Sequence, residues 1–222
     1  MKKFLSFVFV ICLSVLFFGC GNDAVEKIEQ NMSETTKVYY LGECEEFYCT
    51  LSSGTREKDY LLNGFSTDKV PFSLLTLKFF NQSDLNMIRI ILNIENTQKE
   101  VDMELNPISG QFMVDLEKEI GNNKNISVIY DDKTCTLKNL SADFNVDYKK
   151  AIKIGASLFE KQILKNQSFG TLGCEGYLKV VDKKSGNYDE VFWAFSILDM
   201  DGKNWSAIIS TENGKILSYT KQ

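Results

Sequence analysis

The stretch DYKKAIKIGASLFEKQIL, residues 147–164, carries the helical signal of this chain. Its apolar residues recur three or four positions apart and lysines take much of the opposite side, which is typical of an amphipathic helix. Asn145 or Asp147 can cap the start of the helix, because both side chains accept hydrogen bonds from free N–H groups. Gly155 lies on the apolar stripe, where it would allow a close approach to the element that the helix covers.

The apolar stripe also predicts which side chains of this helix enter a core. We expect Ile152, Leu158 and Phe159 to point inward, against a sheet that offers an apolar face. Lys153 lies on the polar side of the helix and should remain in solvent. The helix should therefore cover one face of a β-sheet.

Strand signals follow the helix to the end of the chain. Runs of β-branched and aromatic residues are separated by short turns rich in Gly, Asn, Asp and Ser, which is typical of antiparallel hairpins. The expected strands are 176–182, 188–198 and 205–211, with a short last piece at 215–219. Residues 142–222 thus predict an α+β domain in which one helix packs across an antiparallel meander.

This C-terminal part resembles the PepSY and cystatin-like group of small domains. The resemblance is carried by the strand 191–197, the ending 205–217, and Ala151, Ile152 and Ala156 in the helix. Within that ending, Ser210 stands where the PepSY pattern has aspartate. The resemblance implies a helix-on-sheet fold associated with secreted and membrane-anchored bacterial proteins, some of which have been proposed to restrain proteases.

Strand signals also fill the chain before the helix. Short β-branched and aromatic runs alternate with turn formers, and no helical pattern interrupts the series. The expected strands are 38–41, 47–51, 73–80, 87–94, 101–105, 112–114, 126–130 and 134–140. Many short strands at short intervals favour an immunoglobulin-like β-sandwich over residues 38–141, with a small open barrel as the second choice.

Near residue 141 the spacing of apolar residues changes from the pattern of strands to that of a helix, which predicts two folding units. We expect the β-sandwich at 38–141 and the α+β domain at 142–222 to have separate cores, so that a fragment beginning at Ala142 folds alone. Residues 20–37 are polar and contain few large apolar side chains. This composition predicts a flexible tether.

The first twenty residues predict export. Two lysines precede an apolar run, 4–18, that is short for a membrane span, and a glycine lies directly before Cys20. This arrangement resembles the lipobox of bacterial lipoproteins, which implies a signal peptide over 1–19 and a lipid on the sulfur of Cys20. Phe17 departs from that pattern, which usually has leucine there. The alternative is ordinary cleavage after Gly21, which would give a soluble secreted protein.

Composition narrows the function classes. The formal net charge is −5, and removal of the two signal lysines leaves the mature chain more acidic, so we expect no binding of nucleic acid. The chain contains no histidine, which excludes Ser-His-Asp and Cys-His catalysis and the usual zinc ligand set within this chain. We expect no cofactor, no metal site and no catalytic residues.

Four cysteines remain after the signal is removed and Cys20 takes the lipid. They are Cys44, Cys49, Cys135 and Cys174, which allow three pairings in an oxidising extracytoplasmic compartment. Buried free thiols are equally compatible with the sequence. The absence of a CxxC pair argues against a four-thiolate metal site, and a catalytic cysteine would lack an activating histidine.

The segment DMDGKN, residues 199–204, places oxygen ligands before a glycine, as calcium-binding loops do. Alignment of Gly202 with the invariant glycine of an EF-hand puts Ile197 and Ile208 at the first and last ligand positions, so we expect a hairpin turn instead. Acidic clusters elsewhere could supply a pair of carboxylates to a histidine-free hydrolase. No spacing selects such a pair, so solvated surface charge is their expected role.

We expect a binding protein rather than an enzyme. Successive side chains of a strand face opposite sides, so Phe192 faces outward if Trp193 and Phe195 line the core. An exposed Phe192, together with Tyr188, would be a candidate partner surface unless a neighbouring part of the chain covers it. The sequence thus predicts a lipid-anchored protein on the extracytoplasmic face of the cell membrane that contacts a secreted or envelope protein. A hydrolase and a purely structural envelope component are the alternatives.

Overall fold

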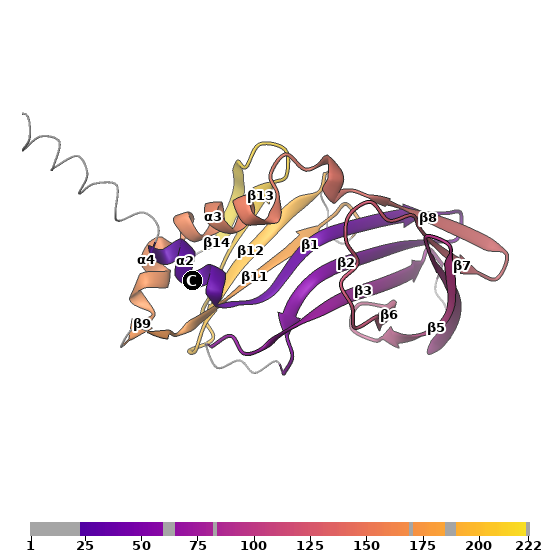
Figure 1. The fold of residues 1–222 in the computed structure, drawn as a ribbon, viewed down its shortest axis with the longest axis horizontal. Coiled ribbons are helices and arrows are strands. Elements are labelled where there is room, and N and C mark those ends of the chain that lie inside the picture. Colours follow the sequence, from indigo (N-terminus) through magenta and orange to yellow (C-terminus); the bar gives the residue numbers. More distant parts are fainter. Residues whose placement is uncertain (1–22, 60–64, 82–83, 169–170, 185–189, 221–222) are drawn as a thin grey trace, which may run out of the picture.

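The computed structural model describes residues 23–59, 65–81, 84–168, 171–184 and 190–220. The fold is mainly β, and twelve strands join into one continuous sheet. One end of this sheet rolls into a closed eight-stranded barrel, and helices cover the other end (Figure 1). The expected immunoglobulin-like sandwich is therefore wrong for the N-terminal part, because its strands close on themselves instead of stacking as two sheets.

Each of the eight strands expected in the N-terminal part overlaps an observed one. The barrel runs in the order β1-β2-β3-β6-β5-β4-β7-β8 and closes where β8 pairs with β1. Its strands are β1 (Met32–Glu43), β2 (Phe47–Glu57), β3 (Lys69–Phe79), β4 (Met87–Ile94), β5 (Thr97–Asn106), β6 (Gln111–Asp115), β7 (Ile126–Tyr130) and β8 (Lys133–Asn139).

Strand β1 belongs to both ends of the molecule. Along one edge it pairs with β2, and along the other edge it pairs first with β11 and then with β8. The pairing with β11 is parallel and starts at Met32 opposite Gly176, whereas the pairing with β8 is antiparallel at Tyr40 and Leu41. The register of β1 shifts between Thr36 and Val38. Such an irregularity bends and twists a strand, which lets β1 leave the open sheet and enter the barrel.

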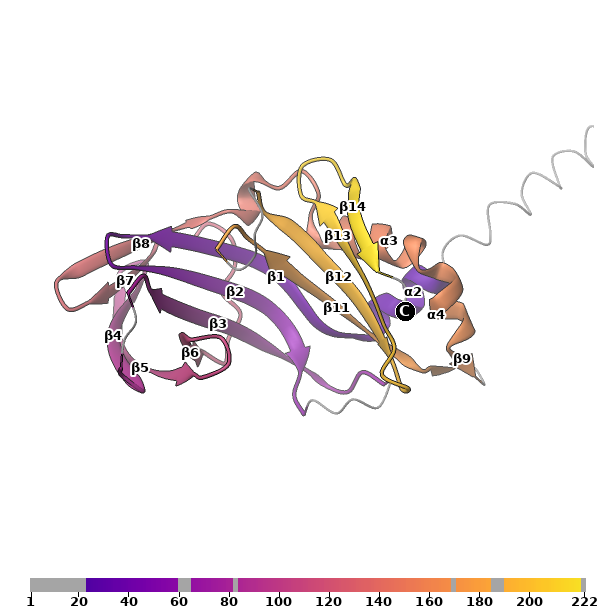
Figure 2. The same ribbon diagram turned by 180° about the vertical axis from the view of Figure 1, so that it is seen from behind.

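The C-terminal half forms the open part of the sheet, in the order β14-β13-β12-β11. Its helices lie on one face, and none of the described helices covers the opposite face (Figure 2). The elements are the 3-10 turn Ser141–Asp143, α3 (Tyr148–Leu158), α4 (Glu160–Lys165), β9 (Gln167–Ser168), β10 (Thr171–Leu172), β11 (Cys174–Val181), β12 (Phe192–Asp199), β13 (Asn204–Ser210) and β14 (Ile216–Thr220). The expected helix across an antiparallel sheet is confirmed.

Helix α3 begins and packs as the sequence predicts. The Asp147 side chain caps it by accepting a hydrogen bond from the Lys150 N–H at 2.8 Å. Ile152 and Phe159 are buried in the core and Leu158 is partly buried against it, while Lys153 is exposed. The helical stretch is broken at Phe159, which separates α3 from α4.

Gly155 lets α3 lie directly on strand β12. A Cβ atom at this position would be 2.2 Å from Cδ1 of the Phe195 ring, a distance that no packed structure permits. Glycine costs a helix about 1 kcal/mol relative to alanine, yet here it places the backbone against an aromatic ring. The close approach expected from the apolar stripe is therefore confirmed.

The N-terminal segment is part of the C-terminal core and not a tether. Residues 23–30 form helix α2 (Asp23–Gln30), and β1 begins two residues later. Ala24, Ile28 and Met32 are buried in the same cluster as the α3 and β12 side chains. The expected division at 141/142 therefore does not separate two independent cores, because the C-terminal core is completed by residues from the start of the described chain.

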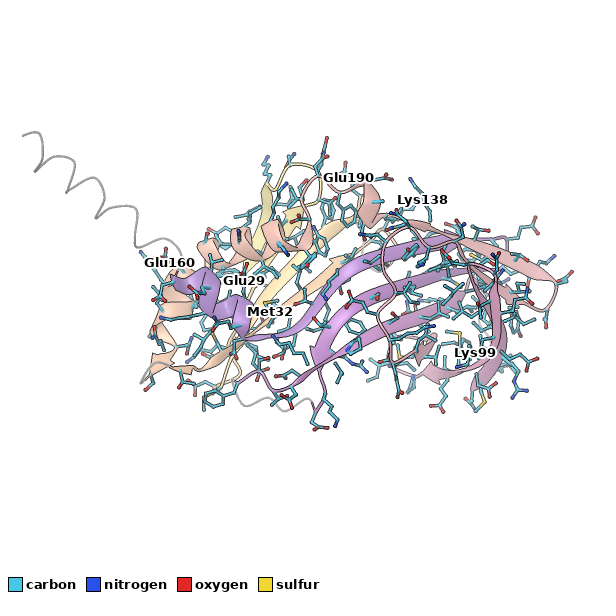
Figure 3. All side chains as sticks on the ribbon, viewed as in Figure 1. Glu29, Met32, Lys99, Lys138, Glu160 and Glu190 are labelled. Atoms are coloured by element: carbon cyan, nitrogen blue, oxygen red, sulfur yellow. The ribbon has the colours of Figure 1, made fainter. Side chains whose placement is uncertain are left out.

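The barrel has its own core and is filled by side chains. Inward residues of all eight strands form one cluster that includes Tyr40, Phe47, Leu75, Met103 and Phe112. Figure 3 shows side chains packed through the inside of the barrel. An eight-stranded barrel is narrow enough for side chains to fill its interior, as they do here. Any ligand must then bind at the ends or on the outside of the barrel.

Candidate binding site at the barrel mouth

The barrel and the helices α2 and α4 lie at opposite ends of an elongated molecule (Figures 1 and 2). Figure 3 places Glu29 and Glu160 at the helical end and Lys99 at the barrel end. Strand β3 runs away from the helices and delivers Phe79 and Phe80 to the far end of the barrel. This far opening of the barrel, where β3 and β5 end and β4 and β6 begin, is called the mouth.

Large apolar side chains are exposed around the mouth. Their exposed fractions are 46% for Phe80, 46% for Leu85, 54% for Met87 and 96% for Ile108. The segments that carry them are held together, because the Leu105 N–H donates to the Asn86 carbonyl at 2.9 Å and β5 pairs with both β4 and β6. These four residues are called the mouth surface. Several large apolar side chains exposed at one end of a molecule make that end a candidate interaction site.

A hollow of about 340 Å³ opens beside the mouth surface. Its walls include Phe79, Phe80, Leu105 and Phe112, and Lys78 and Asn81 add polar groups. This volume is at the small end of the range for ligand pockets, and it has room for one or two apolar side chains of a partner. The aromatic walls and the few polar groups are suited to hold an inserted apolar side chain of a partner.

The floor of the hollow is rigid because aromatic rings pack edge to face behind it. The centroid of the Phe79 ring lies 5.9 Å from that of Phe47, 5.8 Å from that of Phe112 and 5.2 Å from that of Tyr130. Edge-to-face pairs of this kind add about 0.5 to 1.5 kcal/mol beyond the burial of area. The site is thus formed before any partner binds, so binding costs little ordering of the protein.

One lysine lies at the rim of the mouth. The Lys184 Nζ is 5.3 Å from the centroid of the Phe80 ring and 5.8 Å from that of Tyr48, and it forms an ion pair with Glu43 at 2.9 Å. A cation over an aromatic face is attracted by the ring quadrupole. Lys184 therefore holds Phe80 in place at the edge of the hollow.

A second hollow of about 460 Å³ lies on the outer face of the sheet, beside the first half of β1. Three of the charged side chains around it are paired within the protein. Lys179 and Glu34 form an ion pair at 3.1 Å, and Arg56 pairs with Asp115. Glu57 also lines this hollow, and its buried Oε2 atom has no hydrogen-bond partner. This hollow is thus lined mainly by charged groups, whereas the hollow at the mouth is lined mainly by aromatic ones.

A third hollow, of about 560 Å³, lies between α4 and the β12–β13 turn. Asp199 and Asp201 contribute to it, but the Asp199 Oδ1 accepts the N–H groups of Asp201 at 2.9 Å and Lys203 at 2.8 Å. Asp201 forms an ion pair with Lys203 at 3.0 Å. Gly202 has a φ of 78°, as a tight hairpin turn requires. The expected hairpin turn at 199–204 is therefore confirmed.

Other buried carboxylates also hold the fold together. Glu175 accepts a hydrogen bond from the Ser33 hydroxyl at 3.1 Å, and Asp182 accepts one from the Tyr39 hydroxyl. Burial, reinforced by the charge of Asp182, raises the pKa of Tyr39, so its phenol stays protonated and donates. Across the described part of the chain, no group of three or more Cys, Asp or Glu side chains is arranged to hold a metal ion.

The partner surface expected at Phe192 is wrong. Phe192 is only 7% exposed, even though it faces away from the helices, so it cannot serve as an open contact. Tyr188 and Cys20 lie outside the described residues, as does the whole of the expected signal peptide. None of the helices in the described ranges is both long and apolar enough to span a bilayer.

All four expected cysteines are free thiols in the structure. Cys44 is half-buried, and Cys49, Cys135 and Cys174 are buried. Cys174 lies in the C-terminal core, where burial raises the pKa of its thiol to about 12. Cys44, Cys49 and Cys135 belong instead to the barrel.

Sequence reasoning missed the mouth surface, although one signal pointed to it. Ile108 sits in the turn sequence NPISG, residues 106–110, where a large apolar side chain has no core to enter. An isoleucine in such a turn is a candidate contact residue for that reason.

Comparison of this chain with protein-family models, with curated proteins and with solved structures finds no match.

Proposed function

We propose that this chain is a lipid-anchored extracytoplasmic protein that binds a secreted or envelope protein at the barrel mouth. The observation that carries the binding role is the mouth surface, with its preformed aromatic hollow. A partner would insert one or two apolar side chains into that hollow and cover the exposed ring of Phe80. The contacts of Glu175, Asp182 and Asp199 with their own fold support binding rather than hydrolysis.

The N-terminal geometry supports a body held close to the membrane. Helix α2 starts at Asp23, only three residues after Cys20. Three residues span at most roughly 11 Å, so a lipid on Cys20 would keep the α2 end of the protein at the bilayer surface. The mouth, at the opposite end, would then point away from the membrane toward other envelope proteins.

The C-terminal fold supports the resemblance to PepSY and cystatin-like domains, since α3 lies across the antiparallel strands β11 to β14. Ser210 replaces the aspartate of that pattern, and its Oγ accepts the N–H groups of Glu212 at 3.3 Å and Asn213 at 3.4 Å. A carboxylate at this position would accept the same groups. A partner of the protease class is compatible with this resemblance.

The anchor is tested by Cys20→Ala. We expect the variant to leave the membrane fraction, because a thioether-linked lipid at Cys20 is the attachment that the sequence offers. Mass spectrometry of the parent protein should find a lipid-modified cysteine at the mature N-terminus. An unmodified mature N-terminus at Asn22 would contradict the anchor and leave the binding role standing.

The mouth is tested with matched pairs of surface substitutions. A photo-activated cross-linker placed at Ile108 should label one partner in native membranes, and Met87→Asp should abolish the labelling because a charge enters the apolar contact. Leu217→Asp and Met200→Asp change equally exposed apolar side chains outside the mouth surface and should leave it unchanged. Labelling that survives Met87→Asp, or that never exceeds background, would reject the mouth as the binding site.

A further inference from the structure

Three thiols meet inside the barrel at its closing seam. Cys49 on β2 is directly opposite Gly42 on β1, so these two positions face the same side. Cys44 follows the end of β1 and packs against the barrel core, and continuing the β1–β8 register from Leu41 opposite Lys138 places Cys135 across from it. Strand β8 lies so close to Gly42 that a Cβ there would be 2.8 Å from the Cys135 Sγ. Cys135 therefore occupies the space above this glycine.

The three thiols are electrostatically distinct. The neighbouring Cys49 thiol lowers the pKa of Cys135 against the opposing effect of burial, and Cys44 adds a smaller lowering. Burial, together with the interaction with Cys135, raises the pKa of Cys49. Of this pair Cys135 ionises more readily, and the Cys49 thiol is placed to donate to its thiolate.

Access from solvent differs as well. Cys49 and Cys135 are buried, whereas Cys44 is half-buried, with its Sγ 3.4 Å from the Phe47 carbonyl oxygen at the β1–β2 turn. Among the described residues these thiols do not form a metal-binding group. A small oxidant can reach Cys44 first, and Cys135 lies behind it.

From this geometry we infer a reversible disulfide site in which Cys44 and Cys135 form the bridge and Cys49 remains a thiol. The Cys44 thiolate attacks a low-molecular-weight disulfide such as cystine, which forms a mixed disulfide and releases one cysteine. The Cys135 thiolate then attacks the Cys44 sulfur, forms the Cys44–Cys135 bond and releases the second cysteine. Two protein thiols are oxidised, and two electrons reduce one cystine to two cysteines.

The bridge would link the two strands that share the shortest pairing of the barrel. Strands β1 and β8 are paired at Tyr40 with Asn139 and at Leu41 with Lys138, whereas β1 and β2 are paired along almost their whole length. A covalent link from the end of β1 to β8 would hold the barrel closed in the oxidised state. Its operation in the cell rests on the proposed export, because disulfides persist in oxidising compartments.

The purified mature protein tests the site directly. Reduced protein is treated with cystine, digested without reductant and mapped by mass spectrometry, and we expect a peptide pair linked through Cys44 and Cys135. Cys135→Ser and Cys44→Ser should each abolish the bridge. Should Cys44→Ser not fold, folded parent protein alkylated at Cys44 with N-ethylmaleimide replaces it.

Two further variants test whether Cys49 assists the reaction as a hydrogen-bond donor or the thiols react only because they lie close together. Cys49→Ala should still form the bridge but several-fold more slowly near neutral pH, because the Cys135 thiolate loses its donor. Cys174→Ser, a buried thiol in the other core, should change neither yield nor rate. A bridge mapped to Cys49 and Cys135, no bridge at all, or an unchanged rate in Cys49→Ala would overturn the assignment. The peptide map reads the bridge whether or not Cys20 carries a lipid, so failure here is distinct from failure of the anchor.

Discussion

A fragment of residues 142–222 is expected to show no cooperative unfolding transition, whereas the full mature chain shows one. The fragment lacks α2 and β1, which place Ala24, Ile28 and Met32 in the C-terminal core and pair with β11 along its edge. Without them the core is open to water on one side, and the apolar faces of α3 and β11 lose their cover. Urea denaturation followed by tryptophan fluorescence measures this, because Trp193 and Trp205 both belong to that core.

Residues 23–222 provide the control for this experiment. This chain retains every described element and should unfold cooperatively. A sigmoidal transition of the 142–222 fragment, with the fluorescence of the native protein, would mean that α2 and β1 are dispensable. The two halves would then be separate folding units, as the change of sequence period alone suggested.

Phe159→Ala is expected to lower the free energy of unfolding by about 3 to 5 kcal/mol. The Phe159 side chain is fully buried, and its ring stacks on Phe195 with the centroids 6.4 Å apart and the planes at 15°. Truncation removes this contact and leaves a cavity between α3, α4 and β12 that the packed core cannot readily fill. Denaturant titration of the parent and the variant gives the difference directly.

Lys153→Ala is the matched control on the exposed side of the same helix. Surface substitutions of this kind usually change stability by about 0.5 kcal/mol or less. A loss of similar size in the two variants would mean that α3 does not present the face assigned to it.

Local signals in the sequence predicted the strands and the main helix well. The Asp147 cap, the inward face of α3 and the hairpin turn at Gly202 all depend on residues close together in the chain. Such features depend on capping groups, on the spacing of apolar residues and on turn residues, all of which can be read directly from the sequence. They are for that reason the parts of the fold that sequence analysis recovered.

The sequence did not show whether the strands form a closed barrel or two stacked sheets. Sandwich and barrel use the same alternation of apolar and polar residues, and they differ in whether β8 returns to β1, a pairing between distant residues. Helix α2 was missed because only two of its side chains, Ala24 and Ile28, are buried, and its polar face resembles a linker. The mouth surface was missed because it is assembled from two separate connections of the barrel, β3–β4 and β5–β6, and the first residue of β4.

Strand β1 has a consequence for the timing of folding. It is synthesised early, yet the Ser33 side chain contacts Glu175, which lies 142 positions later in the chain. Contacts between residues so far apart are slow to form, because the entropy cost of closing a long loop must be met before the contacts contribute stability. The first strand thus lacks its β11 partner until most of the chain exists, and a chain exported as proposed above would cross the membrane before its sheet is complete.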